Sequence, residues 1–413
     1  MIQNLKLALF LILAMAAGTV RASRVVLTVC NASAEQRQEV VAFDAARVWK
    51  ALGVADGTTL VVTDAYGLQK PSQLTHDGQL LVDVSVLPGS TARLNVKAGR
   101  PDPVQSYAEG KLYAWRVDDF TWENDRCSYR AYGPALQRTG EQAFGIDVWL
   151  KSTPLPDVAR RYAKVYDANR RSVQMRKEGR KAEADSLLMA VSLHLDHGTG
   201  LDCYNVGPSL GCGTPAVMLG DSIVMPYAYR EYRVLDNGPL RFKAEFVYNT
   251  TSVGGQKLTE HRLVTLDRWS YFNRMEVWYE GQTKPIDVCA GVVVHTDQAS
   301  DLTLAADHVA YTDPGDSPQR HQFEIYVAAL FPDGAVGTTK LVRDPWHRKA
   351  GIVGNAVGIR RSLQPGQRFC YYFGASWCQS NTPNRRFWDM QIAQKMADLK
   401  QPLVTDVSPS PSR

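Results

Sequence analysis

Several features that would place a protein in a familiar class are missing from this sequence of 413 residues. Beyond the N-terminus, no apolar run is long enough to cross a bilayer of ~30 Å as a helix, so we expect no membrane span. The cysteine spacings match no zinc site, and no Gly-x-Ser-x-Gly motif marks a hydrolase nucleophile. There is no internal repeat, and no base-stacking or groove-reading pattern, which argues against a nucleic-acid partner.

The first 22 residues have the pattern of a secretory signal peptide. Lys6 supplies a positive charge, Leu7 to Ala17 form an apolar run, and Val20-Arg21-Ala22 offers small residues near a cleavage site. A permanent anchor is the alternative, but the apolar run is short for one. We therefore expect an exported protein, periplasmic or extracellular.

The chain has seven cysteines, and export would permit disulfides. Cys203 with Cys212 and Cys370 with Cys378 are the local pairs that the spacing favours, because each would close a short loop. The odd count leaves at least one free thiol, and the sequence does not fix the pairing.

The formal net charge of +5 is concentrated in one segment. Residues 157–183 contain nine Lys or Arg and four Asp or Glu, an excess of five that equals the whole imbalance. This segment is either a solvated helix face or a basic surface beside a cleft that takes an acidic substrate.

Short β-rich runs separated by turn signals dominate the chain, and they predict an all-β protein. We expect a small β-sandwich over residues 24–99, in which 40–52 could form a strand and a short helix, and a linker near 99–103. A large antiparallel β-supersandwich should follow over 105–400, with one helical insertion at 156–191, and residues 401–413 should be a disordered tail. The strands expected after residue 224 lie at 242–248, 258–266, 275–279, 289–295, 323–330 and 369–373.

One strand pattern suggests a sugar cleft. Residues 146–151 alternate so that Asp147, Trp149 and Lys151 share the face opposite Ile146 and Val148. That polar, aromatic face is either the concave wall of a cleft or simply faces solvent.

The segment 192–213 combines glycines with histidines, aspartates, a tyrosine and an asparagine. Glycine allows the positive φ angles of a shaped binding loop, and such loops often carry chemistry. The alternative is a Gly-rich connector whose polar residues only bond to its own backbone.

Three chemistries are open for this segment and its surroundings. A divalent metal could be held by His194, Asp196, His197 and Asp202, although the spacing matches no established motif, and we expect no cofactor. Glycoside hydrolysis would need paired carboxylates, with Glu123, Asp196, Asp202 and Glu231 as candidates.

Proton abstraction next to a carboxylate fits the residues best. Elimination across C4–C5 of a uronic acid needs a base, an acid for the leaving oxygen, and cations or amides for the carboxylate. The available residues are His197, Tyr204, Tyr229, His295, Arg116 and Arg230.

Several blocks resemble the family called domain of unknown function 4861. They are Trp115–Asp119, Trp122–Arg126, Tyr129–Ala135, Gly145–Trp149, His197–Gly213 and Val234–Arg241, and the likeness covers roughly Tyr107 to Phe387. The resemblance implies a galactose-mutarotase-like supersandwich in exported bacterial proteins encoded beside genes for degrading uronic-acid polysaccharides such as ulvan and pectin. It also implies an oligosaccharide dehydratase or lyase that leaves a 4,5-unsaturated uronate.

Residues and resemblance together predict a β-eliminase acting on an acidic oligosaccharide. The predicted acid and base groups are His197, Tyr204, Tyr229 and His295. The predicted substrate-binding residues are Arg116, Glu123, Asn124, Arg126, Trp149, Asp202, Asn205 and Arg230. A noncatalytic sugar-binding module with Trp115, Trp122 and Trp149 as stacking platforms is one alternative, and a glycoside hydrolase is another.

Overall fold

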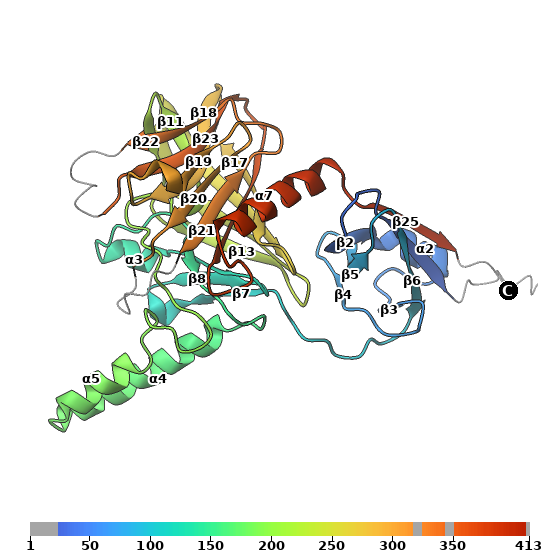
Figure 1. Cartoon of the computed structure of the whole chain (residues 1–413), viewed down its shortest axis with the longest axis horizontal. Helices are drawn as coiled ribbons and strands as arrows, with labels where there is room; N and C mark the ends of the chain where they lie inside the picture. Colours follow the sequence, from blue (N-terminus) through green and yellow to red (C-terminus); the bar gives the residue numbers. More distant parts are fainter. Residues whose placement is uncertain (1–23, 317–323, 343–350, 410–413) are drawn as a thin grey trace, which may run out of the picture. The chain divides into compact units, whose positions relative to one another are not determined.

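The computed structural model describes residues 24–316, 324–342 and 351–409 of the chain. The predicted signal peptide, residues 1–22, lies outside these residues. The described residues divide into two compact units: 24–37, 41–103 and 403–409 form the small unit, and 38–40 with the described part of 104–402 form the large unit (Figure 1).

In the described residues, the small unit contains two β-sheets and one helix. Its four-stranded sheet has the order β25 (Val404–Pro409), β1 (Val25–Cys30), β6 (Thr91–Ala98) and β3 (Leu60–Thr63). The second sheet has the order β2 (Arg37–Asp44), β5 (Gln79–Val86) and β4 (Ser72–Leu74). Helix α2 (Ala45–Leu52) follows β2 directly, and the Asp44 carboxylate caps it by accepting from the Ala46 and Arg47 amides.

The prediction of a disordered tail after residue 401 is wrong for residues 404–409. These residues form β25, which pairs antiparallel with the whole of β1, from Val25↔Pro409 to Cys30↔Val404. The Ser-Pro composition suggested disorder, but edge strands tolerate proline and need few apolar residues when a partner strand supplies the hydrogen bonds. Leu403 and Val407 pack against the core of the small unit.

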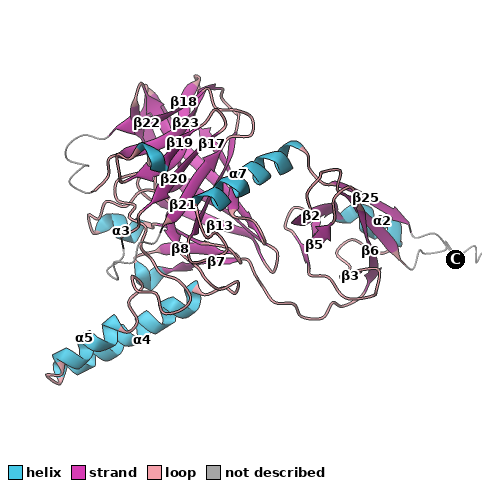
Figure 2. Cartoon of the chain, viewed as in Figure 1, coloured by secondary structure: helices cyan, strands magenta, loops and turns pink. Residues whose placement is uncertain are grey.

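The large unit is built on two antiparallel sheets, which confirms the predicted all-β class. The nine-stranded sheet consists of β13 (Tyr229–Asn237), β14 (Arg241–Tyr248), β16 (Gln256–Asp267), β17 (Phe272–Glu280), β24 (Phe369–Trp377), β21 (Ile325–Leu330), β20 (His308–Asp313) and β19 (Leu302–Leu304), with β15 (Thr251–Val253) beside β16. The five-stranded sheet consists of β12 (Ser222–Val224), β11 (Cys212–Leu219), β18 (Ile286–Val294), β23 (Gly354–Leu363) and β22 (Gly337–Val342). Figure 2 shows how strands dominate this unit.

The two sheets pack face to face around one apolar core. β14 alternates strictly between half-buried and buried residues, as expected for a strand with one face on the core. Its buried Phe242, Ala244 and Phe246 join residues of β18, β20 and β24 in the main cluster. These contacts bring strands β18 and β20, which belong to different sheets, close together.

Helix α7 (Arg385–Lys400) was not expected from the sequence. Its Trp388, Ile392 and Met396 recur every four residues and pack on Tyr271 and Phe272 of the nine-stranded sheet. That spacing was the available signal. None of the helices in the described residues is long and apolar enough to cross a membrane.

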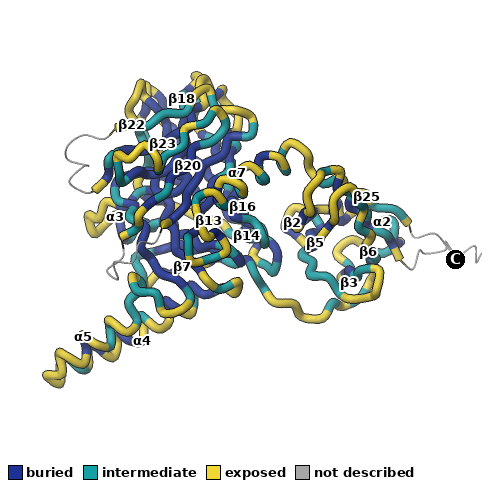
Figure 3. Tube along the Cα trace, in the orientation of Figure 1, coloured by how far each residue is buried: buried dark blue, intermediate teal, exposed yellow. Residues whose placement is uncertain are grey.

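A third, smaller sheet and a helical hairpin extend the large unit. The sheet has the order β10 (Asp147–Trp149), β9 (Ser128–Ala131), β8 (Asp119–Glu123) and β7 (Glu109–Tyr113), with short helices η1 (Ala114–Arg116) and α3 (Pro134–Arg138) beside it in sequence. The predicted helical insertion is two helices, α4 (Val158–Lys177) and α5 (Lys181–Met189), separated at Gly179, which has a φ of 80°. The hairpin is mostly exposed (Figure 3).

Asp147, Trp149 and Lys151 form neither an open cleft wall nor a solvent-facing strand, the two alternatives that the sequence left open. All three are buried, with relative exposures of 0%, 1% and 2%. The reason is that α4 covers this strand: the rings of Trp149 and Tyr162 pack edge to face with centroids 4.9 Å apart. Strand alternation alone does not reveal a second covering layer.

Candidate functional site

The segment 192–211 is a long loop that joins the helical hairpin to the five-stranded sheet. Two of its glycines are required by close backbone contacts: a Cβ on Gly200 would lie 2.0 Å from the Leu150 carbonyl oxygen, and one on Gly211 would lie 2.2 Å from that of Ile146. Both have positive φ, 110° and 53°. The Gly211 carbonyl also accepts from the Val293 amide at 2.8 Å, which fixes the loop to the end of β18.

The loop is not held by a disulfide. All seven cysteines are free thiols, so the predicted pairs Cys203–Cys212 and Cys370–Cys378 do not form. Hydrogen bonds hold the loop instead: the Tyr204 hydroxyl donates to the Gly211 carbonyl at 3.0 Å, and the Asp316 amide donates to the Cys203 carbonyl at 2.7 Å.

A buried ionic cluster surrounds Arg130 of β9. Its guanidinium lies 2.6 Å from the Asp147 carboxylate, 3.3 Å from that of Asp202 and 3.5 Å from that of Asp119. The Cζ atom of the same guanidinium lies 5.3 Å from the centroid of the Trp149 ring. Asp202 is the loop residue that connects the 192–211 segment to this cluster.

Three carboxylates around one guanidinium leave an excess of negative charge in a buried place. Burial is the main cause that raises the pKa of Asp147, to about 8, with Asp202 adding repulsion and Arg130 opposing it. Burial also raises the pKa of Asp119, whose carboxylate accepts from the Tyr162 hydroxyl at 2.9 Å. Burial therefore favours the protonated form of Asp147 over its carboxylate.

A histidine–aspartate pair lies where strands β18 and β20 end, beside the same loop. His295 directly follows β18 of the five-stranded sheet, and Asp313 ends β20 of the nine-stranded sheet. The His295 Nδ1 and the Asp313 Oδ2 are 2.5 Å apart, with side-chain exposures of 11% and 2%. The ring of Tyr204, two residues after Asp202, packs edge to face on His295 with centroids 6.3 Å apart.

The other ring nitrogen of His295, Nε2, is buried and has no hydrogen-bond partner among the described residues. When Nδ1 donates to Asp313, Nε2 carries the free lone pair. The Asp313 carboxylate is itself fixed by the Gly315 amide at 2.8 Å, and the Tyr311 hydroxyl accepts from the His295 amide at 3.2 Å. This is the geometry of a general base oriented by a carboxylate.

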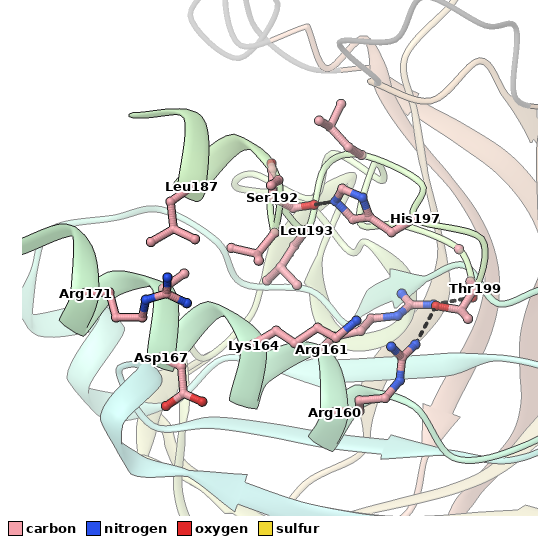
Figure 4. A pocket seen from close by; sticks show the side chains of 15 residues that line it. Arg160, Arg161, Lys164, Asp167, Arg171, Leu187, Ser192, Leu193, His197 and Thr199 are labelled. Atoms are coloured by element: carbon pink, nitrogen blue, oxygen red, sulfur yellow. Dashed lines mark hydrogen bonds between the residues drawn. The ribbon is translucent and has the colours of Figure 1, made fainter. Parts of the chain in front are cut away.

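A separate pocket of about 390 Å³ lies between the helical hairpin and the start of the loop. His197 is on its rim, where Nε2 bonds to the Ser192 carbonyl at 3.0 Å (Figure 4). Four cationic side chains line the same pocket: Arg160, Arg161, Lys164 and Arg171.

The two tyrosines that the sequence suggested as acid or base are engaged elsewhere. Tyr204 donates to Gly211, and Tyr229 donates to the Asp118 carbonyl at 2.6 Å. Burial raises the pKa of both hydroxyls above their usual range. Both groups therefore hold backbone in place, which leaves His197 and His295 of the four predicted groups.

Three residues predicted to bind substrate have structural partners. Glu123 is buried and accepts from Lys151 and from the Asp157 and Val158 amides at the start of α4. Asn124 bonds to the backbone at Asp267, Ser270, Arg126 and Cys127. Arg126 lies over the rings of Trp269 and Tyr271, at 5.4 and 5.1 Å.

The remaining predicted residues divide between the Arg130 cluster and other places. Asp202 and Trp149 contact Arg130, and Arg116 reaches the cluster through Asp119 at 3.8 Å. Asn205 is half-buried in the loop, with its side-chain amide near Gly207 and Gly351. Arg230 is exposed and pairs with Glu231 at 2.9 Å.

The four possible metal ligands do not converge. His194 Nδ1 bonds to the Asp202 carbonyl, the Asp196 carboxylate accepts from the Gly198 and Gly200 amides, and Asp202 pairs with Arg130. Much of the loop's polarity thus serves its own backbone, as the alternative interpretation expected.

The sequence reasoning missed Arg130 and Asp313 as site residues. Arg130 stood in a run of alternating aromatics and charges with nothing to mark it as buried. Asp313 and His295 each stand at the end of a β-rich run, but their pairing depends on how two sheets face each other.

The chain belongs to the family described as domain of unknown function DUF4861, whose match covers residues 29–404. It is 24% identical over 311 residues to "Uncharacterized protein P7" of Formosa agariphila, which covers 73% of this chain and 70% of that protein.

Among solved structures, the chain is similar to an alpha-mannosidase from Enterococcus faecalis V583, with 11% identity and a TM-score of 0.48. It is also similar to a glycosyl hydrolase family 38 protein from Enterococcus faecalis, with 9% identity and a TM-score of 0.47. In both cases the match covers 94% of this chain, which spans only 47% of the longer one.

Proposed function

We propose that the protein is a carbohydrate-active enzyme that carries out β-elimination on uronic-acid-containing oligosaccharides. The observation that carries the proposal is the His295–Asp313 pair at the ends of β18 and β20. The His295 Nε2 has no hydrogen-bond partner among the described residues. A group that takes a proton from carbon needs this arrangement of lone pair and orienting carboxylate. The exported location remains part of the proposal.

In the proposed step His295 Nε2 takes the proton from C5 of the uronate. The C5–H electron pair forms the C4=C5 double bond, and the C4–O bond breaks with its electron pair passing to oxygen. That oxygen takes a proton from the His295 imidazolium, which restores the base, and leaves as water in a dehydratase or as the hydroxyl of the departing sugar in a lyase. Asp313 stabilises the imidazolium that forms.

The developing charge on the uronate carboxylate requires a cation. Of the three arginines considered, Arg126 lies over two aromatic rings and Arg230 pairs with Glu231. Arg116 is 39% exposed, against 20% for Arg126, and its ion pair with Asp119 is long, at 3.8 Å, with no hydrogen bond from Nε to any described residue. We therefore assign this role to Arg116.

The two alternatives have less support. A noncatalytic module would need exposed aromatic platforms. Of the three tryptophans predicted for that role, Trp122 and Trp149 are both 1% exposed and Trp115 is exposed. A glycoside hydrolase would need two facing carboxylates. Of the four candidates, Glu123 caps α4, Asp196 bonds to its own loop, Asp202 pairs with Arg130 and Glu231 is on an exposed strand.

The test is absorbance in the unsaturated-uronate band while the purified protein is incubated with a panel of uronic oligosaccharides. The His295→Asn variant should lower the rate by about 10²–10⁴-fold, the usual contribution of a general base. Asp313→Asn should also lower it, because the amide neither stabilises the imidazolium nor fixes the same tautomer.

His308→Asn is the matched control. His308 is the first residue of β20 and pairs with the preceding Asp307 at 2.9 Å. The His308→Asn substitution should leave the rate unchanged. New reducing ends without absorbance would indicate hydrolysis. Binding without any product would indicate a module. Equal rates in His295→Asn and wild-type protein would remove His295 from the mechanism.

A further inference from the structure

The helical hairpin pocket offers unpaired positive charge. Four cationic side chains and one carboxylate, that of Asp167, line it. Two of the cations already have a partner: Arg160 and Arg161 share the single Asp157 carboxylate, at 2.5 and 2.7 Å.

Lys164 and Arg171 are different. Neither forms an ion pair or hydrogen bond with any described residue, and they lie two turns apart on the side of α4 that lines the pocket. In Figure 4 their side chains extend toward the pocket, and the Asp167 carboxylate lies apart from both. Two such cations with no partner carboxylate create a positive potential within the recess.

The rest of the lining is suited to a sugar. Leu187, Val191, Leu193 and Leu195 supply apolar surface, and Ser192 and Thr199 supply polar groups. The volume of about 390 Å³ falls in the range of small-ligand pockets.

We propose that this pocket is a binding subsite for an anionic group carried by a saccharide, either a carboxylate or a sulfate ester, with Lys164 and Arg171 as its binding residues. The inference rests on the proposed function only for the saccharide nature of the ligand. Neither His295 nor Asp313 lines the pocket. The inference therefore adds that the substrate carries an acidic group besides the uronate at which elimination occurs.

The experiment is calorimetric titration of the full-length protein with three probes: an oligogalacturonate, a sulfated galactan oligosaccharide free of uronate, and a neutral cello-oligosaccharide. The variant is Lys164→Met with Arg171→Met. The control variant is Arg170→Met with Lys177→Met, which removes the same charge from the same helix outside the pocket lining. All four positions are exposed, and methionine is a good helix former, so both variants should fold.

Binding of at least one anionic probe should weaken about tenfold or more in the pocket variant and stay unchanged in the control, since charge-assisted hydrogen bonds are lost. The probe that responds identifies carboxylate or sulfate as the ligand. Equal weakening in both variants would mean a general charge effect and would overturn the proposal, as would no anionic binding to the wild-type protein. The titration needs no turnover, so failure of the elimination proposal would leave its result interpretable.

Discussion

Replacing Glu123 by glutamine tests whether this residue supports the fold or binds substrate. The Glu123 carboxylate lies 2.5 Å from Lys151 Nζ, and the two side chains are 2% and 1% exposed. It also accepts from the Asp157 and Val158 amides at 2.9 Å, at the positive end of α4.

The expected cost follows from that environment. Glutamine keeps the shape but leaves the Lys151 ammonium without a buried counter-charge, which costs about 3–5 kcal/mol. For a unit of this size, that loss lowers the melting temperature by about 6–10 °C, since 1 kcal/mol corresponds to about 2 °C. Lys151→Met in the same chain should recover much of the stability, because no buried charge then remains unpaired.

The assay is urea unfolding followed by tryptophan fluorescence. This signal reports mainly the large unit, because Trp49 alone of the nine tryptophans belongs to the small unit. Glu231→Gln is the control: Glu231 and Arg230 are 66% and 45% exposed, and breaking their pair should cost about 1 kcal/mol or less. If Glu123→Gln unfolds within about 1 kcal/mol of wild type, the structural role argued here for Glu123 is refuted.

Three further predictions concern Asp147, Tyr204 and the cysteines. Because burial raises the pKa of Asp147 from 3.8 to about 8, the native state holds a proton that the unfolded state releases, and the contribution to stability falls as pH rises across this window. Asp147→Asn should flatten that part of the curve of unfolding free energy against pH, and parallel curves would contradict the assignment. Tyr204→Phe should cost about 1 kcal/mol and leave elimination within a few-fold of wild type, because the Gly211 carbonyl keeps its bond from Val293. A much larger loss of rate, with the fold intact, would return Tyr204 to the chemistry. Titration of denatured, unreduced protein with a thiol reagent should count seven thiols, and a count of five would mean that one disulfide forms.

The sequence predicted the fold class well because strand alternation is a local signal. β14 shows it plainly, with buried Phe242, Ala244 and Phe246 alternating with half-buried residues. The same signal misled at β10, where α4 covers the face that should have been open. A strand that is buried on both faces still has an amphipathic sequence when polar residues on one face have buried partners, as Asp147 has in Arg130.

The candidate site was predicted only in part, for a related reason. His295 could be chosen by residue type, but its partner Asp313 comes from the other sheet. The role of Glu123 depends on Lys151, 28 residues away, and on where α4 begins. Charged residues of this kind have the same appearance in sequence whether they bind substrate or pair with each other, and only the tertiary contacts distinguish the two.

The pairing of β25 with β1 has a consequence for the order of assembly during synthesis. β1 is made early, but its partner at 404–409 emerges only after the whole of the large unit has been translated. Until then β1 exposes an unpaired edge, which is a site for wrong pairing with other chains. The small unit, although its strands come first in the sequence, is therefore completed last, and a released chain that ends at residue 402 should contain a finished large unit and an open small unit.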